Sequence, residues 1–440
     1  MKVPDAPRCA VLGNAPSRIV LIALVVASIV FVYGAAELAL RAAAGLGLVE
    51  LVPPPSVSDT WARDGWVVDR DLHWVRPRNY TGVTARKWFR TNSFGLRDRE
   101  MSLEKPAQTV RILALGDSTV FGFRVPIEGT FSKRLEAMLN QDPGDTQFEV
   151  INAGVQSYSL YNSFVYLKRD GIRFDPDIIL LETNYNDRRY VPSRFHRDGK
   201  LFYRYFWYSM RLRETFAWSY VFRGLRRVLL ENPIAAAWRD PQPEDLIGTG
   251  EYSFLQIEMN DLQCRVSPAR YDAMLNEFID YSLAREIPVV LVPLRDPPDQ
   301  LAAYREAVAL AEQGSPKRAL EILEKMLEES FHYRLIAAAK INEIVDSIGQ
   351  PEERIDRIPV PVEWMGTGGN VPIFTADPYI DSMQRAAKRE GVIIAEIDPQ
   401  ELAQKTLYMD YIHLNALGHE LLAQSIHRAI RESDEIDLGR

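Results

Sequence analysis

The sequence has few of the side chains that bind metal ions or form disulfides. Its 440 residues include two cysteines and six histidines, and no group of Cys and His has the spacing of a zinc or haem site. Cys9 precedes a long apolar segment and Cys264 lies far beyond it, so we expect no disulfide between them. We therefore expect neither a metal ion nor a cofactor.

An excess of positive charge is absent as well. The formal net charge is −8, and the sequence has no nucleic-acid-binding motif and no glycine-rich phosphate loop. We therefore expect no nucleic acid among the partners. The length allows one large domain with insertions, or two domains.

Charge is scarce near the N-terminus, where only Glu37 interrupts the apolar run of residues 19–40. Such a run of about 18–22 residues is typical of a membrane-spanning helix and exceeds the apolar core of a signal peptide. Three basic residues precede it against one acidic residue, which places residues 1–18 in the cytoplasm and the rest of the chain outside. We expect a single-pass anchor in the cytoplasmic (inner) membrane. The alternative is a signal peptide cleaved near the alanines at 42–44.

Two segments connect this run to the main domain. Residues 41–60, with three consecutive prolines at 53–55, predict a stiff linker. Residues 61–109 are rich in aromatic and basic side chains, and we interpret them as an N-terminal extension packed on the main domain.

From residue 110 the pattern alternates between short apolar runs and amphipathic segments. Strands are predicted at 110–115, 148–152, 178–183, 289–292 and 392–397. Helices are predicted at 128–140, 160–170, 269–285, 378–390 and 415–431. Buried strands that alternate with helices indicate a parallel sheet with helices on both faces. We assign residues 110–432 to this α/β domain.

Two insertions exceed that pattern. Residues 188–260 carry many aromatic side chains and arginines, and we interpret them as a helical cap whose aromatic residues pack. The alternative is a surface that contacts anionic headgroups or an acidic glycan. Residues 299–375 contain two helical patterns around Gly314, like one tetratricopeptide-type hairpin, followed by a loop. Because one hairpin cannot bury its face alone, we expect it to pack on the α/β domain. The alternative is a protein partner at residues 303–330.

The first predicted strand ends in Gly116-Asp117-Ser118. A serine at the carboxyl end of a buried strand lies where open α/β sheets carry out chemistry. Such a triplet is common after strands, so by itself it is weak evidence of a nucleophile.

A general base is predicted near the C-terminus. His413 follows the fifth predicted strand and precedes the last helix, for which Asn415 is the expected N-cap. Asp410 can accept the Nδ1 proton of this imidazole, which leaves Nε2 to take the proton of a serine. The alternative is a chance His and Asp near a helix start. The other histidines are predicted to pack, to lie on the surface, or to belong to the extension and insertions: His73, His196, His332, His419 and His427.

Donors for an oxyanion are expected at the ends of the neighbouring strands. Gly154 follows the second strand, and its backbone N–H can approach a ligand closely. Asn186 follows the third strand and offers a side-chain amide. The backbone N–H of Ser118 is the third donor.

Together, the blocks Gly116-Asp117-Ser118, Gly154, Asn186-Asp187 and Asp410-x-x-His413 resemble the SGNH (GDSL-type) hydrolases in residues and order. The resemblance implies a flavodoxin-like three-layer α/β/α sandwich with a parallel five-stranded sheet and no metal. It also implies a nucleophile, Ser118, a base, His413, an orienting carboxylate, Asp410, and an oxyanion hole of Ser118, Gly154 and Asn186. Two positions differ: Asn184 replaces the usual glycine two residues before Asn186, and Thr119 replaces leucine.

The leading hypothesis is a membrane-anchored, extracytoplasmic (periplasmic) serine hydrolase of O-acyl esters. The substrate class is an acylated small molecule or, by analogy with family members of that compartment, an O-acetylated glycan. The second hypothesis is an O-acyltransferase that acts on an extracytoplasmic polysaccharide. The third is a non-catalytic glycan-binding or scaffold protein on the same fold.

Overall fold

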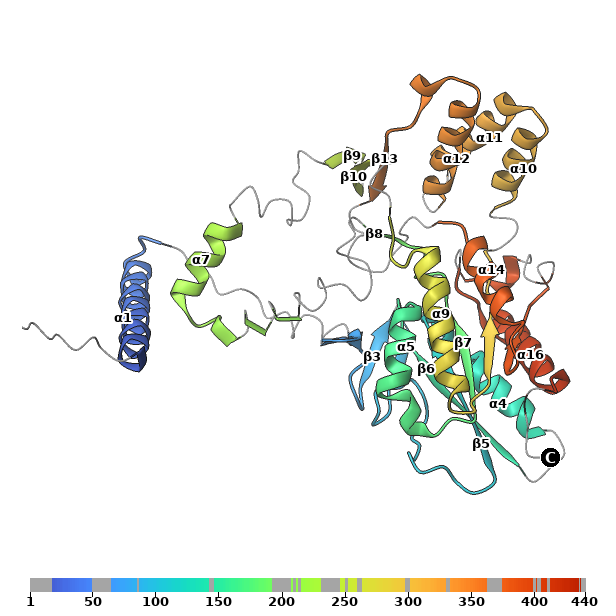
Figure 1. The fold of residues 1–440 in the computed structure, drawn as a ribbon, viewed down its shortest axis with the longest axis horizontal. Helices are drawn as coiled ribbons and strands as arrows, with labels where there is room; N and C mark the ends of the chain where they lie inside the picture. The colour runs from blue at the N-terminus through green and yellow to red at the C-terminus, as the bar shows by residue number, and fades with distance from the viewer. Residues whose placement is uncertain are drawn as a thin grey trace, which may run out of the picture. The chain divides into compact units, whose positions relative to one another are not determined.

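A computed structural model shows two compact units, Met1–Ser56 with Met210–Asp240 and Val57–Ser209 with Pro241–Arg440 (Figure 1). The residues that the structure describes are 18–49, 65–84, 87–141, 146–191, 207–208, 211–212, 215–230, 246–249, 252–258, 263–296, 301–329, 333–361, 374–398, 401, 405–409, 412–434 and 436. Most of the predicted linker lies outside these residues.

The first unit contains two described helices, α1 (Arg18–Gly45) and α7 (Tyr220–Leu230). Within α1, Ile22–Gly45 is long and apolar enough to cross a membrane, with a mean hydropathy of 2.2. The helix therefore extends five residues beyond the predicted end at residue 40. Its topology and the fate of the N-terminus stay predictions.

The polar residue of this apolar helix holds α7. The carboxylate of Glu37 accepts hydrogen bonds from the backbone N–H groups of Tyr220 and Val221, each at 2.9 Å. These N–H groups have no acceptor within α7, because they belong to its first turn. Part of the predicted cap therefore packs on the predicted anchor.

The second unit is built on five parallel strands. They are β5 (Thr109–Gly116), β6 (Gln147–Gly154), β7 (Ile178–Glu182), β12 (Val289–Val292) and β14 (Val392–Ile394), in the spatial order β14-β12-β7-β5-β6. This is the flavodoxin-like order, with its switch point between the first and third strands, β5 and β7. The predicted five-stranded fold is confirmed. The fifth strand is three residues shorter than predicted.

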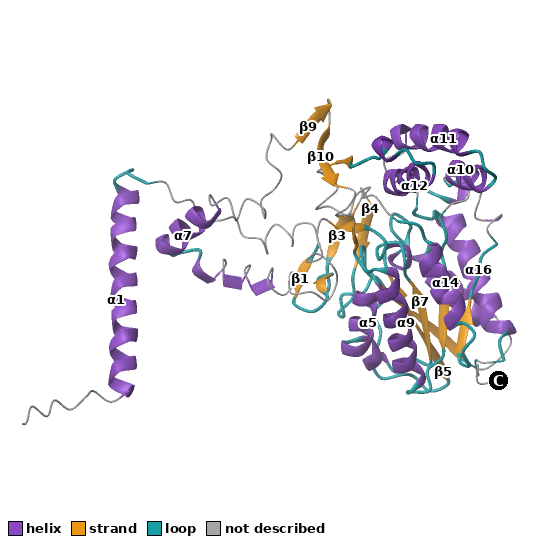
Figure 2. Ribbon diagram, turned by 45° about the horizontal axis from the view of Figure 1, so that its top comes forward, coloured by secondary structure: helices purple, strands orange, loops and turns teal. Residues whose placement is uncertain are grey.

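Helices cover both faces of this sheet (Figure 2). One face packs on α5 (Leu160–Arg169), α9 (Pro268–Leu283) and α14 (Asp377–Ala386), and the other on α4 (Phe131–Gln141) and α16 (Ala416–Glu432). Alternate residues of β5 face the two layers, since Leu113 belongs to the first cluster and Ile112 to the second. Asn415 caps α16 by accepting the N–H of Leu417 at 2.9 Å, as predicted.

The N-terminal extension forms two hairpins, β1 (Val67–Asp69) with β2 (His73–Val75) and β3 (Thr81–Thr84) with β4 (Lys87–Arg90). It packs on the α/β core as predicted. Trp74 Nε1 donates to the carbonyl of Gln156 at 3.1 Å, and the hydroxyl of Tyr158 donates to the carbonyl of Trp74 at 2.7 Å.

Among its described residues, the segment 188–260 contains strands as well as helices, so the prediction of a helical cap was incomplete. It also contributes β8 (Tyr190–Val191), β9 (Leu246–Thr249) and β10 (Tyr252–Glu258). The partners are β11 (Gln263–Cys264) for β8 and β13 (Arg357–Pro361) for β10. The β10–β13 pair joins the two insertions across about a hundred residues of sequence, and local periodicity does not encode such a pairing.

The second insertion contains the predicted hairpin, α10 (Ala302–Glu312) and α11 (Pro316–Glu329), and a third helix, α12 (Arg334–Ser347), that we did not predict. Gly314 adopts φ 79° between the hairpin helices, a conformation that glycine adopts without steric cost. The cluster that buries Ala307, Ala319 and Leu323 also contacts Tyr185, beside the predicted Asn186. A partner surface at residues 303–330 stays a prediction. Short 3-10 turns occur at Ile127–Gly129, Gly171–Phe174, Pro351–Glu353 and Lys405–Leu407.

Candidate active site

The predicted nucleophile and base meet at the carboxyl edge of the sheet. Ser118 begins the short helix α3 (Ser118–Phe121) directly after β5, and His413 lies just before α16. The Nε2 atom of His413 is 3.0 Å from the Oγ atom of Ser118. The ring of Phe123 packs against the imidazole, with 4.4 Å between the centroids. Asp410 lies outside the described residues, so its role as the orienting carboxylate stays a prediction.

The turn between β5 and α3 sets the position of Ser118. Gly116 has φ 155°, and a Cβ atom there would lie 2.2 Å from the carbonyl oxygen of Glu182. Asp117 is the N-cap of α3, and its Oδ1 accepts the N–H of Thr119 at 2.8 Å. As the first residue of the helix, Ser118 has a backbone N–H with no acceptor in the helix itself. This N–H is placed to donate to an oxyanion.

Gly154 permits the end of β6 to touch the helix of the nucleophile. A Cβ atom on Gly154 would lie 2.2 Å from the backbone nitrogen of Phe121 and 2.6 Å from the carbonyl carbon of Val120. The N–H of Gly154 donates to Oδ1 of Asn152 at 3.1 Å, while Nδ2 of Asn152 donates to the carbonyl of Val120 at 2.7 Å. In this state, the predicted oxyanion donor is engaged, and a bound oxyanion has to compete with Asn152 for it.

Asn186 is also buried beside the nucleophile. Its Nδ2 donates one hydrogen to Oδ2 of Asp117 at 2.6 Å, which leaves the second amide hydrogen for another acceptor. Asn184 adopts φ 140°, so it supplies the turn where the SGNH pattern has glycine. Its Nδ2 donates to the carbonyl of Leu294 at 2.9 Å.

Glu182, which sequence reasoning missed, is a buried acid at the end of β7. It lies in hydrogen-bonding contact with Asp117. Burial, and then the charge of Asp117, raise the pKa of Glu182 well above its ordinary value, which favours the protonated form of Glu182 as a donor to Asp117. Burial also raises the pKa of Asp117, against its hydrogen bonds and the nearby charge of His413. The available signal was an acidic residue that ends an apolar run, Ile178–Glu182.

A second missed residue, Arg97, holds the far end of α3. Its guanidinium donates to the carbonyl groups of Phe121 and Gly122, each at 2.6 Å. These carbonyls belong to the last turn of the helix and have no donor within it. Through Arg97, the end of the N-terminal extension therefore supports the turn that carries Ser118.

A small cavity adjoins the serine. Its volume is about 30 Å³, and its lining includes Ser118, Asn184, Leu294, Tyr408 and Ile412. The volume is close to that of one or two water molecules. Arg188 and Asp296 form a buried ion pair at its wall, with 2.8 Å between Nη1 and Oδ2.

The other histidines of the helical layer do not join this site. His419 is buried in α16, where its Nδ1 accepts the N–H of Phe131 at 3.2 Å, and burial lowers its pKa to about 3. His427 is half-buried on the same helix. Among the described residues, no group of three or more His, Cys, Asp or Glu is arranged to hold a metal ion.

No protein-family model and no curated protein matches the sequence. Solved structures with a similar fold include TesA, with 10% identity, a TM-score of 0.35, and coverage of 73% of this chain and 98% of the other. An acetyl xylan esterase from Geobacillus stearothermophilus has 11% identity, a TM-score of 0.34 and coverage of 73% and 94%. A member of the lipolytic G-D-S-L family from Veillonella parvula has 9% identity, a TM-score of 0.33 and coverage of 74% and 100%.

These similarities are too low to transfer an activity, and the chain's own features are more specific. The sheet has the flavodoxin-like strand order, and the serine block ends its first strand. The glycine and asparagine blocks end the next two strands in the expected order. The flavodoxin-like strand order and the placement of these motif blocks agree with the fold that the resemblance to the SGNH-type hydrolases implies.

Proposed function

We propose that this chain is a serine hydrolase of short O-acyl esters, with O-acetyl groups on a glycan as its substrates. The observation that carries the proposal is the 3.0 Å contact between Ser118 Oγ and His413 Nε2. A serine hydroxyl is a poor nucleophile until an adjacent base takes its proton, and this pair supplies both groups at the switch point of the sheet.

The chemistry proceeds in two steps. In the first, His413 takes the proton of Ser118 while Oγ attacks the ester carbonyl carbon, and the carbonyl oxygen becomes an oxyanion. The N–H of Ser118 and the second amide hydrogen of Asn186 are the donors for that oxyanion. His413 then protonates the departing alcohol, and an acyl-serine remains. In the second step, water attacks the acyl group with His413 as base, which releases the acid and restores the serine.

Two observations support the narrower parts of the proposal. The cavity beside Ser118 is about 30 Å³, which favours acetyl over longer acyl groups. The apolar helix α1 and the basic residues before it are consistent with an anchor that leaves the α/β domain outside the cytoplasm. Polymers decorated with acyl groups are accessible to an enzyme in that compartment.

The test uses the full-length protein in detergent with p-nitrophenyl acetate, p-nitrophenyl octanoate and an acetylated glycan. We expect turnover of the acetate and of the glycan, little turnover of the octanoate, and labelling of Ser118 by a fluorophosphonate. Ser118→Ala and His413→Ala should each lower kcat by about 10³-fold or more, whereas the control His427→Ala should match the wild type. Equal turnover by wild type and Ser118→Ala would rule the proposal out.

A further inference from the structure

A second cavity lies between the N-terminal extension and α5. Its volume is about 470 Å³, which is within the range of small-molecule sites. None of its lining residues belongs to the lining of the cavity beside Ser118. It is therefore a separate concavity of the same unit, and the catalytic chemistry described above does not use it.

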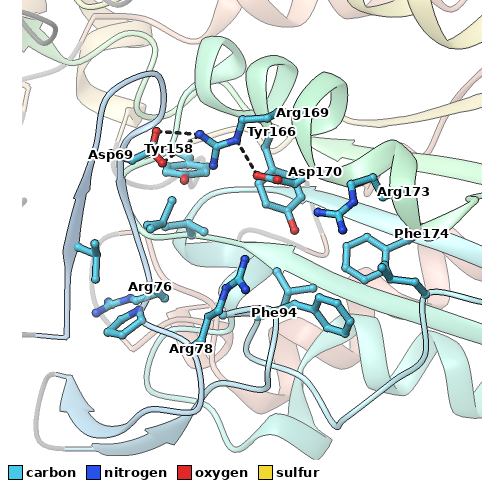
Figure 3. A pocket seen from close by; sticks show the side chains of 17 residues that line it. Asp69, Arg76, Arg78, Phe94, Tyr158, Tyr166, Arg169, Asp170, Arg173 and Phe174 are labelled. Atoms are coloured by element: carbon cyan, nitrogen blue, oxygen red, sulfur yellow. Dashed lines mark hydrogen bonds and ion pairs between the residues drawn. The ribbon is translucent and has the colours of Figure 1, made fainter.

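The acidic groups in its wall are already paired. Nη1 of Arg169 lies 2.9 Å from both carboxylate oxygens of Asp69, and Nε of Arg169 lies 2.8 Å from Oδ2 of Asp170. Figure 3 shows these three side chains at one side of the cavity, with their hydrogen bonds. Arg169 neutralises one of the two carboxylates, so the cluster keeps a single negative charge, and the three other arginines of the lining outweigh it.

Those remaining charges are positive. Arg78 and Arg173 are exposed, and Figure 3 shows both guanidinium groups pointing into the space between the two walls. Within the described part of the chain, neither side chain has an ion-pair or hydrogen-bond partner. Two unpaired arginines that converge on one cavity are suited to a carboxylate or another oxyanion, because the guanidinium fork matches its geometry.

A tyrosine completes this polar centre. Tyr166 is only 7% exposed, and its hydroxyl points into the cavity beside Arg173 (Figure 3). That hydroxyl makes no hydrogen bond to the residues that the structure describes. Burial and then the charge of Asp170 raise the pKa of Tyr166, whereas Arg169, Arg173 and Arg78 act to lower it. Tyr166 is therefore a neutral donor and acceptor, positioned for a ligand.

Much of the remaining wall is apolar. Phe94 and Phe174 form an edge-to-face pair with 5.2 Å between centroids. Arg76 is a buried residue of the lining, and its guanidinium lies 3.4 Å from the ring centroid of Trp66 and donates to the carbonyl of Gly65 at 2.7 Å. Burial lowers the pKa of Arg76 to about 9, so it stays charged at neutral pH and adds to the positive potential of the site.

We propose that this cavity binds a carboxylated sugar unit of an acidic glycan. Arg78 and Arg173 hold the carboxylate, Tyr166 holds a ring or carboxylate oxygen, and the aromatic pair contacts the apolar face of the sugar ring. The choice of a saccharide over other anions rests on the proposed function, whereas the anion site rests on the cavity itself.

The test measures binding of a trimeric galacturonate to the full-length protein in detergent by isothermal titration calorimetry. A neutral galactose trimer and inorganic phosphate are the comparison ligands. We expect binding of the uronate, weaker binding of phosphate and no binding of the neutral trimer. Arg78→Gln and Arg173→Gln should each weaken uronate binding about ten-fold or more. Tyr166→Phe should weaken it less, and Arg270→Gln, an exposed arginine of α9, should not change it.

Ser118→Ala separates this inference from the proposed catalysis, because it should lose hydrolysis and keep uronate binding. If the wild type binds the uronate but hydrolyses none of the esters, the proposed hydrolase function is overturned and the proposed binding site stands. No binding of the uronate, equal binding of the neutral trimer, or phosphate binding as tight as uronate binding would each overturn the inference. Unchanged affinity in the Arg78→Gln/Arg173→Gln double variant would also overturn it, since the ligand would then lie elsewhere.

Discussion

The carboxyl groups of Asp117 and Glu182 meet at the switch point of the sheet, where the first and third strands end side by side. Asp117 uses its oxygens to hold α3 and the amide of Asn186. Burial favours the protonated form of Glu182, and as a donor to Asp117 it supports the positions of the predicted nucleophile, Ser118, and of Asn186.

Glu182→Gln should leave kcat and the melting temperature nearly unchanged, because the amide still donates to Asp117 and has the same shape. Glu182→Leu should lower the melting temperature and reduce kcat about ten-fold or more, since it removes a donor from a buried carboxylate at a cost of about 1–3 kcal/mol. Kinetics with p-nitrophenyl acetate and a thermal melt for each variant provide the comparison. A fully active Glu182→Leu variant would show that the carboxyl pair does not position the site.

Gly154→Ala should impair both folding and activity. The added methyl group would lie 2.2 Å from the backbone nitrogen of Phe121, so α3 has to move or β6 has to bend. Overpacking of this kind costs about 1–3 kcal/mol, and any shift of α3 moves Ser118. Gly34→Ala is the matched control, because nothing lies within 4 Å of a Cβ atom there. Wild-type kcat in Gly154→Ala would contradict the close contact of β6 with α3.

His419 should make the fold sensitive to acid. Its folded pKa of about 3 is below the ordinary value of 6.5, so an unfolded chain takes up a proton that the folded chain does not. The contribution of His419 to the free energy of unfolding is therefore fully present above pH 6.5. It declines as the pH falls toward 3, and about 2 kcal/mol of it is lost at pH 5.

The comparison for this prediction is the melting temperature of wild type, His419→Gln and His427→Gln at pH 7 and pH 5. The destabilisation caused by His419→Gln should shrink at the lower pH, because the variant lacks the buried imidazole. His427→Gln, elsewhere on α16, should follow the wild type. A constant effect of His419→Gln at both pH values would show that this imidazole does not stay neutral in the fold.

Glu37 should be required for the packing of α7 on α1. A Cβ atom on Gly224 would lie 3.8 Å from Cδ1 of Leu40, so cysteines at these two positions should react with a short bismaleimide when both native cysteines are replaced by serine. Glu37→Ala removes the acceptor for two N–H groups of the first turn of α7, and the crosslinking yield should fall. Glu37→Gln keeps an acceptor oxygen, so its crosslinking yield should exceed that of Glu37→Ala. Unchanged yield in Glu37→Ala would show that other contacts hold the pair.

Much of the fold was predictable because its signals are local. The five strand runs are apolar since both faces of the sheet are covered, and all five were found in the sequence. Asn415 was predicted as an N-cap because it is a residue type that favours this position and it directly precedes the apolar pattern of a helix. Ser118 and His413 were singled out by type and position, although 295 residues separate them.

The features that the sequence prediction missed depend on contacts between residues that are distant in the chain and leave no local sequence pattern. β10 pairs with β13 in another insertion, and nothing near either strand encodes its partner. Glu182 was passed over as the end of an apolar run, since its role appears only when β7 lies beside β5. The engagement of Gly154 by Asn152 depends on atomic contacts that a sequence motif does not specify.

By itself, the sequence determined the order of strands and helices, the apolar N-terminal helix and the residue types available for acyl chemistry, because hydrophobic periodicity and capping act over a few neighbouring residues. Only the tertiary structure decided that the buried carboxyl of Glu182 lies beside Asp117, that α7 packs on α1, and that Arg78, Tyr166 and Arg173 converge on a second cavity. Those relationships arise from packing between segments that are distant in the chain, where burial sets protonation states and leaves polar groups facing open space.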